Sequence, residues 1–341
     1  MYKKIFVSNR AGLGDVLLGN PVLKALKHKF PDSKITLMVG WDAVDIVEGL
    51  DFIDEVITYA YEKQRGIPDL IHMVRKVWRY DLAILLDFKY RSAVMPFLAG
   101  IPIRAGIEHK RKLFLTHPMR RTPDWESTYE PHNYAKIIKY SLGIELDPAI
   151  LDQLCIPATK SHDINVVDQL LATHGVDEYT PIITIAPFSS WAPKDWPVKY
   201  YRQLIEQISC RYPHKIILIG MGSDCDRLDK LDKNSNVINL MGKTTLAQTI
   251  EVIRRSRLFI GGCSGPLHIA GACKIPYITM YGPSSPARWA PRSPGIVITR
   301  NPACGPCSVN MTGCVEKPCI VDITVEEVYD ACEKMMRDKD I

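Results

Sequence analysis

The chain has 341 residues, of which 46% are hydrophobic and 24% charged, as in an ordinary soluble globular protein with room for two domains. Its net charge of +5 is mild, so it suits an anionic substrate or a peripheral contact with an acidic surface and does not indicate nucleic-acid binding. No run of 18 apolar residues predicts a transmembrane helix, and residues 1–15 are typical of a first strand and loop rather than a signal peptide.

The first half of the chain alternates predicted strands and helices. The first strand, 3–8, is followed by a glycine-bearing loop at 9–15 and a helix at 16–30. A dinucleotide-binding turn is rejected there, because Leu17 stands where that motif needs its third glycine. Further strands are predicted at 35–39, 55–59, 82–87 and 103–107, with helices at 66–79, 93–98 and 134–142 and a basic loop excursion at 108–135.

The second half restarts the same alternation after a weakly periodic boundary at 145–165. Strands are predicted at 181–187, 215–220 and 237–240, and helices at 166–173, 198–211, 223–231 and 245–255. Two successive β/α halves predict an α/β protein with two Rossmann-like domains facing a central cleft. We place the domains at 1–155 and 156–322, followed by a C-terminal helical segment at 323–341.

Residues 257–283 form the most informative stretch, with the predicted pattern strand, tight turn, short helix, strand. Gly261 and Gly262 allow the turn, Ser264 is a good N-cap, and Pro266 suits a first helical turn. A helix that begins after a strand presents free N–H groups and its positive dipole end, which favours a phosphate-sized anion. The alternative is an ordinary capped βαβ turn.

Four of the ten cysteines lie close together near the end of the chain. Cys304, Cys307, Cys314 and Cys319 have the spacing C-x2-C-x6-C-x4-C, which could hold one tetrahedral zinc or iron ion. Such a metal would be structural, because protein would fill all four positions. The alternative is a loop of buried or locally paired thiols. Without a secretory signal we expect a reducing cytoplasm, which argues against a disulfide framework.

Three segments together carry a resemblance that covers most of the chain. They are GDVLLGNPVLKALKHKFPDSKITLMV at 14–39, KDWPVKYYRQLI at 194–205 and SGPLHIAGACKIPYITMYGPSSP at 264–286. In these segments the sequence resembles the bacterial ADP-heptose:lipopolysaccharide heptosyltransferases of glycosyltransferase family 9. The resemblance implies a GT-B fold and transfer of a heptose with inversion, from a nucleotide sugar such as ADP-heptose and without an essential divalent metal. It also implies that the last helix crosses back to the first domain.

The resemblance also implies roles for individual residues. Asp15 matches the proposed catalytic base, although it could instead be a helix N-cap. Lys194 matches the lysine that contacts the donor phosphates, although a solvated lysine is the alternative, and Asp224 lies where an acidic residue often binds the ribose hydroxyls. The full donor-binding set that we expect is Ser190, Lys194, Asp224, Thr244, Ser264, Gly265 and His268.

The sequence departs from the family pattern at one position. Cys263 stands where the family usually has an aspartate, so the donor could be a different nucleotide sugar. A protein acceptor, or a non-catalytic nucleotide-sugar-binding protein of this fold, also stays open. In the first domain we expect Arg10, Arg91 and Arg104 to bind an anionic glycolipid or glycan acceptor, with a solvated basic face as the alternative. The protein is expected in the cytoplasm, with a peripheral contact to the inner membrane.

Overall fold

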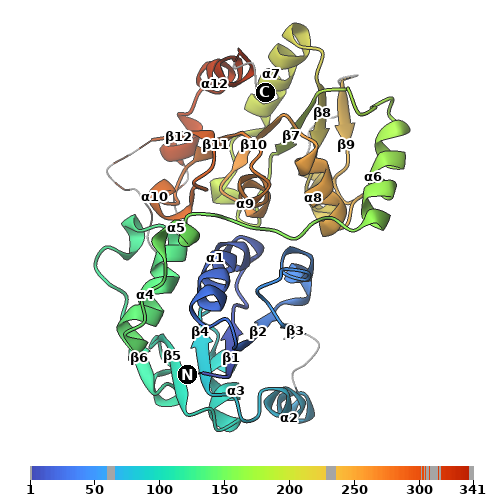
Figure 1. The fold of residues 1–341 in the computed structure, drawn as a ribbon. Helices are drawn as coiled ribbons and strands as arrows, with labels where there is room; N and C mark the ends of the chain where they lie inside the picture. Colours follow the sequence, from blue (N-terminus) through green and yellow to red (C-terminus); the bar gives the residue numbers. More distant parts are fainter. Residues whose placement is uncertain are drawn as a thin grey trace. The chain divides into compact units, whose positions relative to one another are not determined.

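The computed structural model describes residues 2–59, 66–227, 236–300, 302, 304, 307, 314 and 316–337. The ends of the helices predicted at 223–231 and 323–341 therefore lie outside the described residues. The chain divides into two compact units, Met1–Ala158 and Thr159–Ile341, which we call the first and second units. Each unit has its own parallel sheet with helices packed on it (Figure 1).

The sheet of the first unit has, within the described residues, six strands in the order β3-β2-β1-β4-β5-β6. All neighbouring pairs are parallel, with Ile5 of β1 opposite Ile35 of β2 and Leu82 of β4. The central strands are buried because their apolar runs are covered on both faces. The strands are β1 (Lys4–Ser8), β2 (Lys34–Val39), β3 (Glu55–Thr58), β4 (Leu82–Leu85), β5 (Ile103–Ile107) and β6 (His117–Met119).

The helices of the first unit follow the predicted order, with differences at their ends. The first helix begins at Leu13, three residues earlier than expected, and Gly12 is its N-cap. The excursion at 108–135 contains β6 and two short 3-10 helices that the sequence did not predict. The helices are α1 (Leu13–Lys29), η1 (Trp41–Ile46), α2 (Ile67–Lys76), α3 (Tyr90–Leu98), η2 (Lys112–Phe114), η3 (Trp125–Ser127), α4 (Glu130–Leu142) and α5 (Pro148–Leu151).

The sheet of the second unit repeats this topology, with the described strands in the order β12-β11-β10-β7-β8-β9. Its strands are β7 (Ile182–Ala186), β8 (Lys215–Leu218), β9 (Val237–Asn239), β10 (Leu258–Gly262), β11 (Tyr277–Tyr281) and β12 (Gly295–Thr299). Its helices are α6 (Ser161–Ala172), η4 (Ala192–Lys194), α7 (Val198–Arg211), η5 (Gly222–Arg227), α8 (Leu246–Arg254), α9 (Gly265–Ala272), α10 (Pro286–Trp289), α11 (Pro318–Val321) and α12 (Val325–Arg337).

The C-terminal helix α12 packs on the second unit through its apolar face, and the expectation that it crosses back to the first domain stays a prediction. Its apolar face, with Val325, Val328 and Cys332, belongs to the core formed with β7, β8 and α7. Figure 1 shows α12 beside α7. The indole Nε1 of Trp196 donates a hydrogen bond to the carbonyl of Ile323 at 2.9 Å, which fixes the approach to the helix.

Both sheets reverse their strand order at one place, between β1 and β4 in the first unit and between β7 and β10 in the second. In open α/β sheets, ligands bind outside the carboxyl ends of the strands at such a reversal. The connections that leave β1, β4, β7 and β10 are therefore where the fold positions a site. Among the described helices, none is long and apolar enough to cross a membrane.

Candidate functional site

The connection from β1 to α1 places Asp15 at the carboxyl end of β1. Asp15 is partly exposed in the first turn of α1. Gly12 is the N-cap residue, so the alternative interpretation of Asp15 as the N-cap is wrong. The amide Nδ2 of Asn9 donates to the main-chain carbonyl of Asp15 at 3.0 Å, and Gly19 leaves the space that the Asn9 side chain fills. The carboxylate is thus on an anchored turn and open to solvent.

Two of the three predicted acceptor arginines meet around one tyrosine. The guanidinium of Arg10 lies 4.3 Å from the ring centre of Tyr59, and Nη1 of Arg91 donates to the Tyr59 hydroxyl at 2.7 Å. Together they line a small surface hollow of about 10 Å³, which has room for about one water molecule. The other lining residues are apolar: Met38, Leu70, Met73 and Met95. A cationic rim over an apolar floor suits the anionic edge of an amphipathic ligand.

Arg104, the third predicted acceptor residue, is engaged by its own unit. Its Nε donates to the carbonyl of Phe114 at 2.7 Å, and its Nη1 donates to the carbonyl of Ile101. Its guanidinium also lies 5.4 Å from the ring centre of Phe97, and burial lowers the pKa of Arg104. The structure therefore does not bring Arg104 together with Arg10 and Arg91, and its guanidinium holds the β5–β6 connection.

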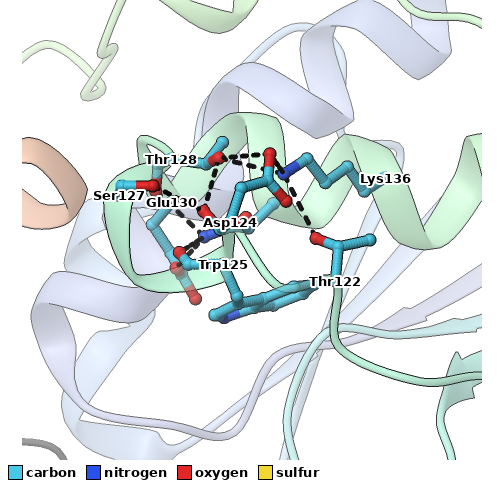
Figure 2. Close-up of polar contacts among 8 residues, drawn as sticks. Thr122, Asp124, Trp125, Ser127, Thr128, Glu130 and Lys136 are labelled. Carbon is cyan, nitrogen blue, oxygen red and sulfur yellow. Dashed lines mark hydrogen bonds and ion pairs between the residues drawn. The ribbon is translucent and has the colours of Figure 1, made fainter.

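The connection from β6 to α4 carries a polar network that the sequence did not reveal. Figure 2 shows Lys136 of α4 reaching Asp124, Thr122 and Thr128, with Nζ 2.7 Å from Asp124 Oδ2. The hydrogen bond from Lys136 is the largest cause that holds the pKa of Asp124 well below its usual value. This network fixes the turn that presents Arg121, whose guanidinium lies 4.7 Å from the ring centre of Phe88.

The β10–α9 turn in the second unit has the geometry that the sequence predicted. Ser264 is the N-cap residue of α9 and Gly265 its first helical residue. The Ser264 hydroxyl, however, donates to the carbonyl of Gly262 at 3.3 Å and makes no cap hydrogen bond to the helix within the described structure. The positive end of α9 is therefore left without a side-chain cap, as an anion site requires.

His268 and Lys194 stand together at this turn. His268 is buried in α9, and its Nδ1 has no hydrogen-bond partner among the described residues. Burial lowers the pKa of His268 to about 3, with the positive charge of Lys194 as the second cause. The main chain of Lys194 packs closely against Gly262, because a Cβ at position 262 would lie 3.3 Å from the carbonyl oxygen of Lys194. The site thus combines a cation with a neutral imidazole at a helix N-terminus.

Asp224, the predicted ribose ligand, is buried and already bonded. Its Oδ1 accepts from Nη1 of Arg227 at 3.1 Å, and its Oδ2 accepts from the main-chain N–H of Met221 at 3.3 Å. Arg227 also bonds to Asp195, whose Oδ1 accepts from the N–H and the hydroxyl of Ser189 at 2.8 and 2.7 Å. Asp224 therefore helps to join the β7–η4 and β8–η5 connections.

Asp195 and Arg227 were not predicted from the sequence. The position of Asp195 next to Lys194 was an available signal, whereas nothing in the sequence pointed to Arg227. The remaining predicted donor residues are Ser190 and Thr244. Ser190 is exposed in the β7–η4 connection, and the hydroxyl of Thr244 is 2.8 Å from that of Thr249 before α8.

The four clustered cysteines influence one another electrostatically. Burial, followed by the nearby Cys304 and Cys314, raises the pKa of Cys307. Burial is also the first cause that raises the pKa of Cys319, with the other three cysteines contributing. Within the described ranges, however, no group of three histidine, cysteine, aspartate or glutamate side chains is arranged to hold a metal ion.

Two parallel Rossmann-like sheets of identical topology, each with its candidate residues after the strands at the order reversal, are the GT-B fold. Residues 69–319 match the model of glycosyltransferase family 9 (heptosyltransferase), and the chain belongs to this family. The protein is therefore a glycosyltransferase.

Relatives and solved structures agree with this assignment. The chain is 25% identical over 304 residues to lipopolysaccharide heptosyltransferase 2 of Escherichia coli K12, covering 83% of this chain and 84% of the relative. It superposes on a family 9 glycosyltransferase from Veillonella parvula with a TM-score of 0.87 and 22% identity, covering 99% and 98% of the two chains. The E. coli ADP-heptose lps heptosyltransferase II gives a TM-score of 0.79 with 22% identity over 99% of this chain and 100% of that chain.

Proposed function

We propose that the protein transfers a heptose from ADP-heptose to a hydroxyl of the lipopolysaccharide core in the cytoplasm, with inversion at the anomeric carbon. Family membership and the names of its relatives support the reaction class and the donor. The observation that carries the proposal is the β10–α9 turn, where the N-terminus of α9 has no side-chain cap among the described residues and the main chain of Lys194 lies against Gly262. A helix end and a cation are the groups that a diphosphate needs.

In the proposed reaction, Asp15 accepts the proton of the acceptor hydroxyl while its oxygen attacks the anomeric carbon of the donor. The bond from that carbon to the diphosphate oxygen breaks, and the negative charge develops on the diphosphate. Lys194 and the N–H groups of α9 stabilise this charge. His268 stays neutral near pH 7 because of its low pKa, so the positive side-chain charge at this turn comes from Lys194.

We propose that the rim formed by Arg10 and Arg91 holds an anionic group of the acceptor. Both side chains contact Tyr59 and border the same hollow. Arginine pairs bind phosphate and carboxylate oxygens through parallel N–H donors. Arg104 is left out of this set, because its guanidinium donates to two main-chain carbonyls.

A panel of nucleotide sugars tests the donor. Purified protein is mixed with a lipopolysaccharide-core acceptor and with ADP-heptose, ADP-glucose, UDP-glucose or GDP-mannose, and the release of nucleoside diphosphate is measured. The proposal expects acceptor-dependent release from ADP-heptose that exceeds the others by at least about tenfold. Turnover of a different nucleotide sugar would favour the second candidate, a GT-B transferase with another donor. Cys263, buried at the β10–α9 turn in place of the family's aspartate, is the observation that favours it.

We also propose that Cys304, Cys307, Cys314 and Cys319 bind one structural zinc or iron ion. Four thiolates are a complete tetrahedral donor set, and the cysteines already influence one another's pKa values. The metal would fix the chain before α11 and supply no group to the transfer reaction. Elemental analysis of the purified protein should give about one zinc or iron ion per chain, and Cys307→Ser should abolish it. Equal metal content in that variant would contradict this proposal.

The peripheral membrane contact is proposed for a face formed by α2, α3 and η2, which we call the α2–α3 surface. These elements are neighbours, and the ring of Phe114 contacts both Tyr90 and Phe97, with ring centres 5.1 and 5.4 Å apart. Exposed basic residues accompany the apolar ones, so the surface suits an anionic membrane. Its exposed large apolar residues are Ile67, Ile71, Trp78, Tyr90, Phe97, Leu98 and Leu113, and its exposed bases are Arg75, Lys76, Arg79, Lys89, Lys110 and Lys112.

Vesicle sedimentation tests this surface independently of catalysis. The protein should sediment with vesicles that contain phosphatidylglycerol and much less with pure phosphatidylcholine. Leu113→Asp should weaken sedimentation, because Leu113 is 89% exposed on this face. Tyr179→Asp is the matched control, since Tyr179 is 83% exposed but lies in the second unit. Equal losses in the two variants, or no binding to anionic vesicles, would contradict the assignment.

A further inference from the structure

Asp87 is a buried carboxylate that the reaction described above does not use. It follows β4 at the strand-order reversal of the first unit and is only 1% exposed. Its Oδ2 accepts hydrogen bonds from the hydroxyl of Ser8 at 2.5 Å, the hydroxyl of Ser92 at 3.0 Å and the main-chain N–H of Arg10 at 3.1 Å. Its Oδ1 accepts from the main-chain N–H of Lys89 at 2.8 Å.

The charge of Asp87 is balanced by an equally buried arginine. Nη1 of Arg111 lies 3.8 Å from Asp87 Oδ1, and both side chains are at most 1% exposed. The same guanidinium donates to the carbonyls of Ile107 at 3.0 Å and Lys89 at 3.2 Å. Burying a charged pair is costly, and apolar residues of similar size often serve stability as well. An ion pair kept in the core therefore calls for an explanation beyond packing.

The partners of Asp87 belong to three different connections at one edge of the sheet. Ser8 ends β1, and Arg10 lies in the β1–α1 connection, which leads to Asp15. Lys89 and Ser92 begin α3, which carries Arg91, and Arg111 lies in the β5–β6 connection. The strands β1, β4 and β5 are neighbours in the sheet, so one carboxylate joins three adjacent loops.

Asn9 links the hydrogen-bonded residues around Asp87 to Asp15 itself. Asn9 stands between the two residues Ser8 and Arg10 bonded to Asp87, and its main-chain N–H donates to the carbonyl of Met38 at 2.9 Å. Its side-chain Nδ2 donates to the carbonyl of Asp15 at 3.0 Å. The sequence of contacts thus runs from Asp87 through Ser8 and Arg10 to Asn9 and then to the backbone of Asp15.

We propose that Asp87 is a positioning residue that holds the β1–α1 loop, and with it Asp15, in register with the Arg10–Arg91 rim. This inference rests on the proposed role of Asp15 as the base. Asp87 does not touch substrate, and all its contacts given above are to groups of its own unit. Its effect is to fix the distance between the proton acceptor and the anionic group of the acceptor molecule. Misplacement of a reacting group by about 1 Å can cost about 100-fold in rate.

Ser8→Ala is a sharper test than Asp87→Asn, because it removes one hydrogen-bond donor to Asp87 and leaves the ion pair between Asp87 and Arg111 intact. We expect kcat for heptose transfer to fall about 10- to 100-fold, with the Kd of ADP unchanged, because the proposed ADP site lies in the second unit. Ser8→Thr keeps the hydroxyl and should restore kcat. Asp87→Asn should lose at least as much activity as Ser8→Ala. The matched control is Ser33→Ala, which removes an equally buried hydroxyl that bonds to Tyr2, away from this loop.

Amide hydrogen exchange provides a readout that does not depend on catalysis. Exchange of residues 9–15 should become about tenfold faster in Ser8→Ala and stay unchanged in Ser33→Ala. The inference is overturned if exchange in this loop is unchanged, or if kcat stays within twofold of the wild type while exchange rises. If the wild type transfers no heptose, or if Asp15→Asn stays active, the proposed function fails instead, and loop exchange alone decides whether Asp87 holds the loop.

Discussion

Replacing Lys194 by alanine tests the diphosphate site most cleanly within the second unit. Lys194 is half-buried, and its ammonium lies 5.7 Å from the ring centre of Trp191. It forms no ion pair with a carboxylate in the described parts of the chain, so its removal leaves no buried charge unpaired. We therefore expect the free energy of unfolding to change by less than about 0.5 kcal/mol. The loss should appear in ligand binding instead.

The size of that loss follows from the bond that Lys194 would make to a phosphate oxygen. Hydrogen bonds to charged groups contribute about 1.5–3 kcal/mol, and every 1.4 kcal/mol is about tenfold in Kd. Lys194→Ala should therefore weaken ADP binding roughly 10- to 100-fold, measured by titration calorimetry. The pKa of His268 should also rise, because the nearby positive charge that helps to lower it is removed.

Lys199→Ala is the control for the change in net charge. Lys199 is an exposed lysine of α7, five residues further along the chain, and its ammonium lies 5.1 Å from the ring centre of Tyr200. Its removal should leave the Kd of ADP within about twofold of the wild type. If Lys194→Ala behaves like Lys199→Ala, the assignment of Lys194 to the donor phosphates is refuted.

Three further predictions concern stability and the loop that carries Asp15. The pKa of His268 is lowered to about 3, so between pH 6.5 and 3 the unfolded chain binds a proton that the folded chain does not, and stability falls as pH falls through this range. At pH 5 this effect of His268 should lower the free energy of unfolding by about 2 kcal/mol. The free energy of urea unfolding should therefore depend less on pH in His268→Gln than in the wild type, and equal dependence would contradict this. Gly19→Ala places a Cβ 2.6 Å from Nδ2 of Asn9, which should displace its hydrogen bond to the carbonyl of Asp15. The substitution should lower the free energy of unfolding by about 1–3 kcal/mol and also lower kcat. An unchanged kcat would count against the anchoring of Asp15. Trp196→Phe leaves the carbonyl of Ile323 without its donor and should cost about 1–3 kcal/mol in urea unfolding, whereas a change below about 0.5 kcal/mol would show that this bond does not fix α12.

The fold was predictable because the strands are short apolar runs separated by helical spacing. Leu82–Leu85 and Ile182–Ala186 are examples in which every residue is buried. The order of these elements predicts parallel sheets, and parallel sheets gather the connections after their strands at one edge. The connections next to Lys194 and His268 could therefore be placed at one edge before any coordinates were known, whereas the roles of these two residues came from the family resemblance. β6, with only His117–Met119, is too short to give such a signal.

What the sequence could not predict depends on contacts between distant residues. The carboxylate of Asp87 meets Ser8 and Arg111 from separate segments, and no spacing in the sequence relates the three. Arg104 has the residue type of an acceptor ligand, but nearby main-chain carbonyls take its guanidinium. The packing of α12 is of the same kind, because its apolar face is buried against second-unit residues that are distant in the sequence.

The central claim is that Asp15 removes the acceptor proton in a heptose transfer. The most direct measurement is the kcat of Asp15→Asn with ADP-heptose and a lipopolysaccharide-core acceptor, together with the Kd of ADP. Asparagine keeps the size of the side chain but cannot take the proton, and general-base catalysis contributes about 100- to 10,000-fold. The account predicts a loss of at least about 100-fold in kcat with an unchanged Kd of ADP. Turnover near the wild-type rate in Asp15→Asn would contradict it.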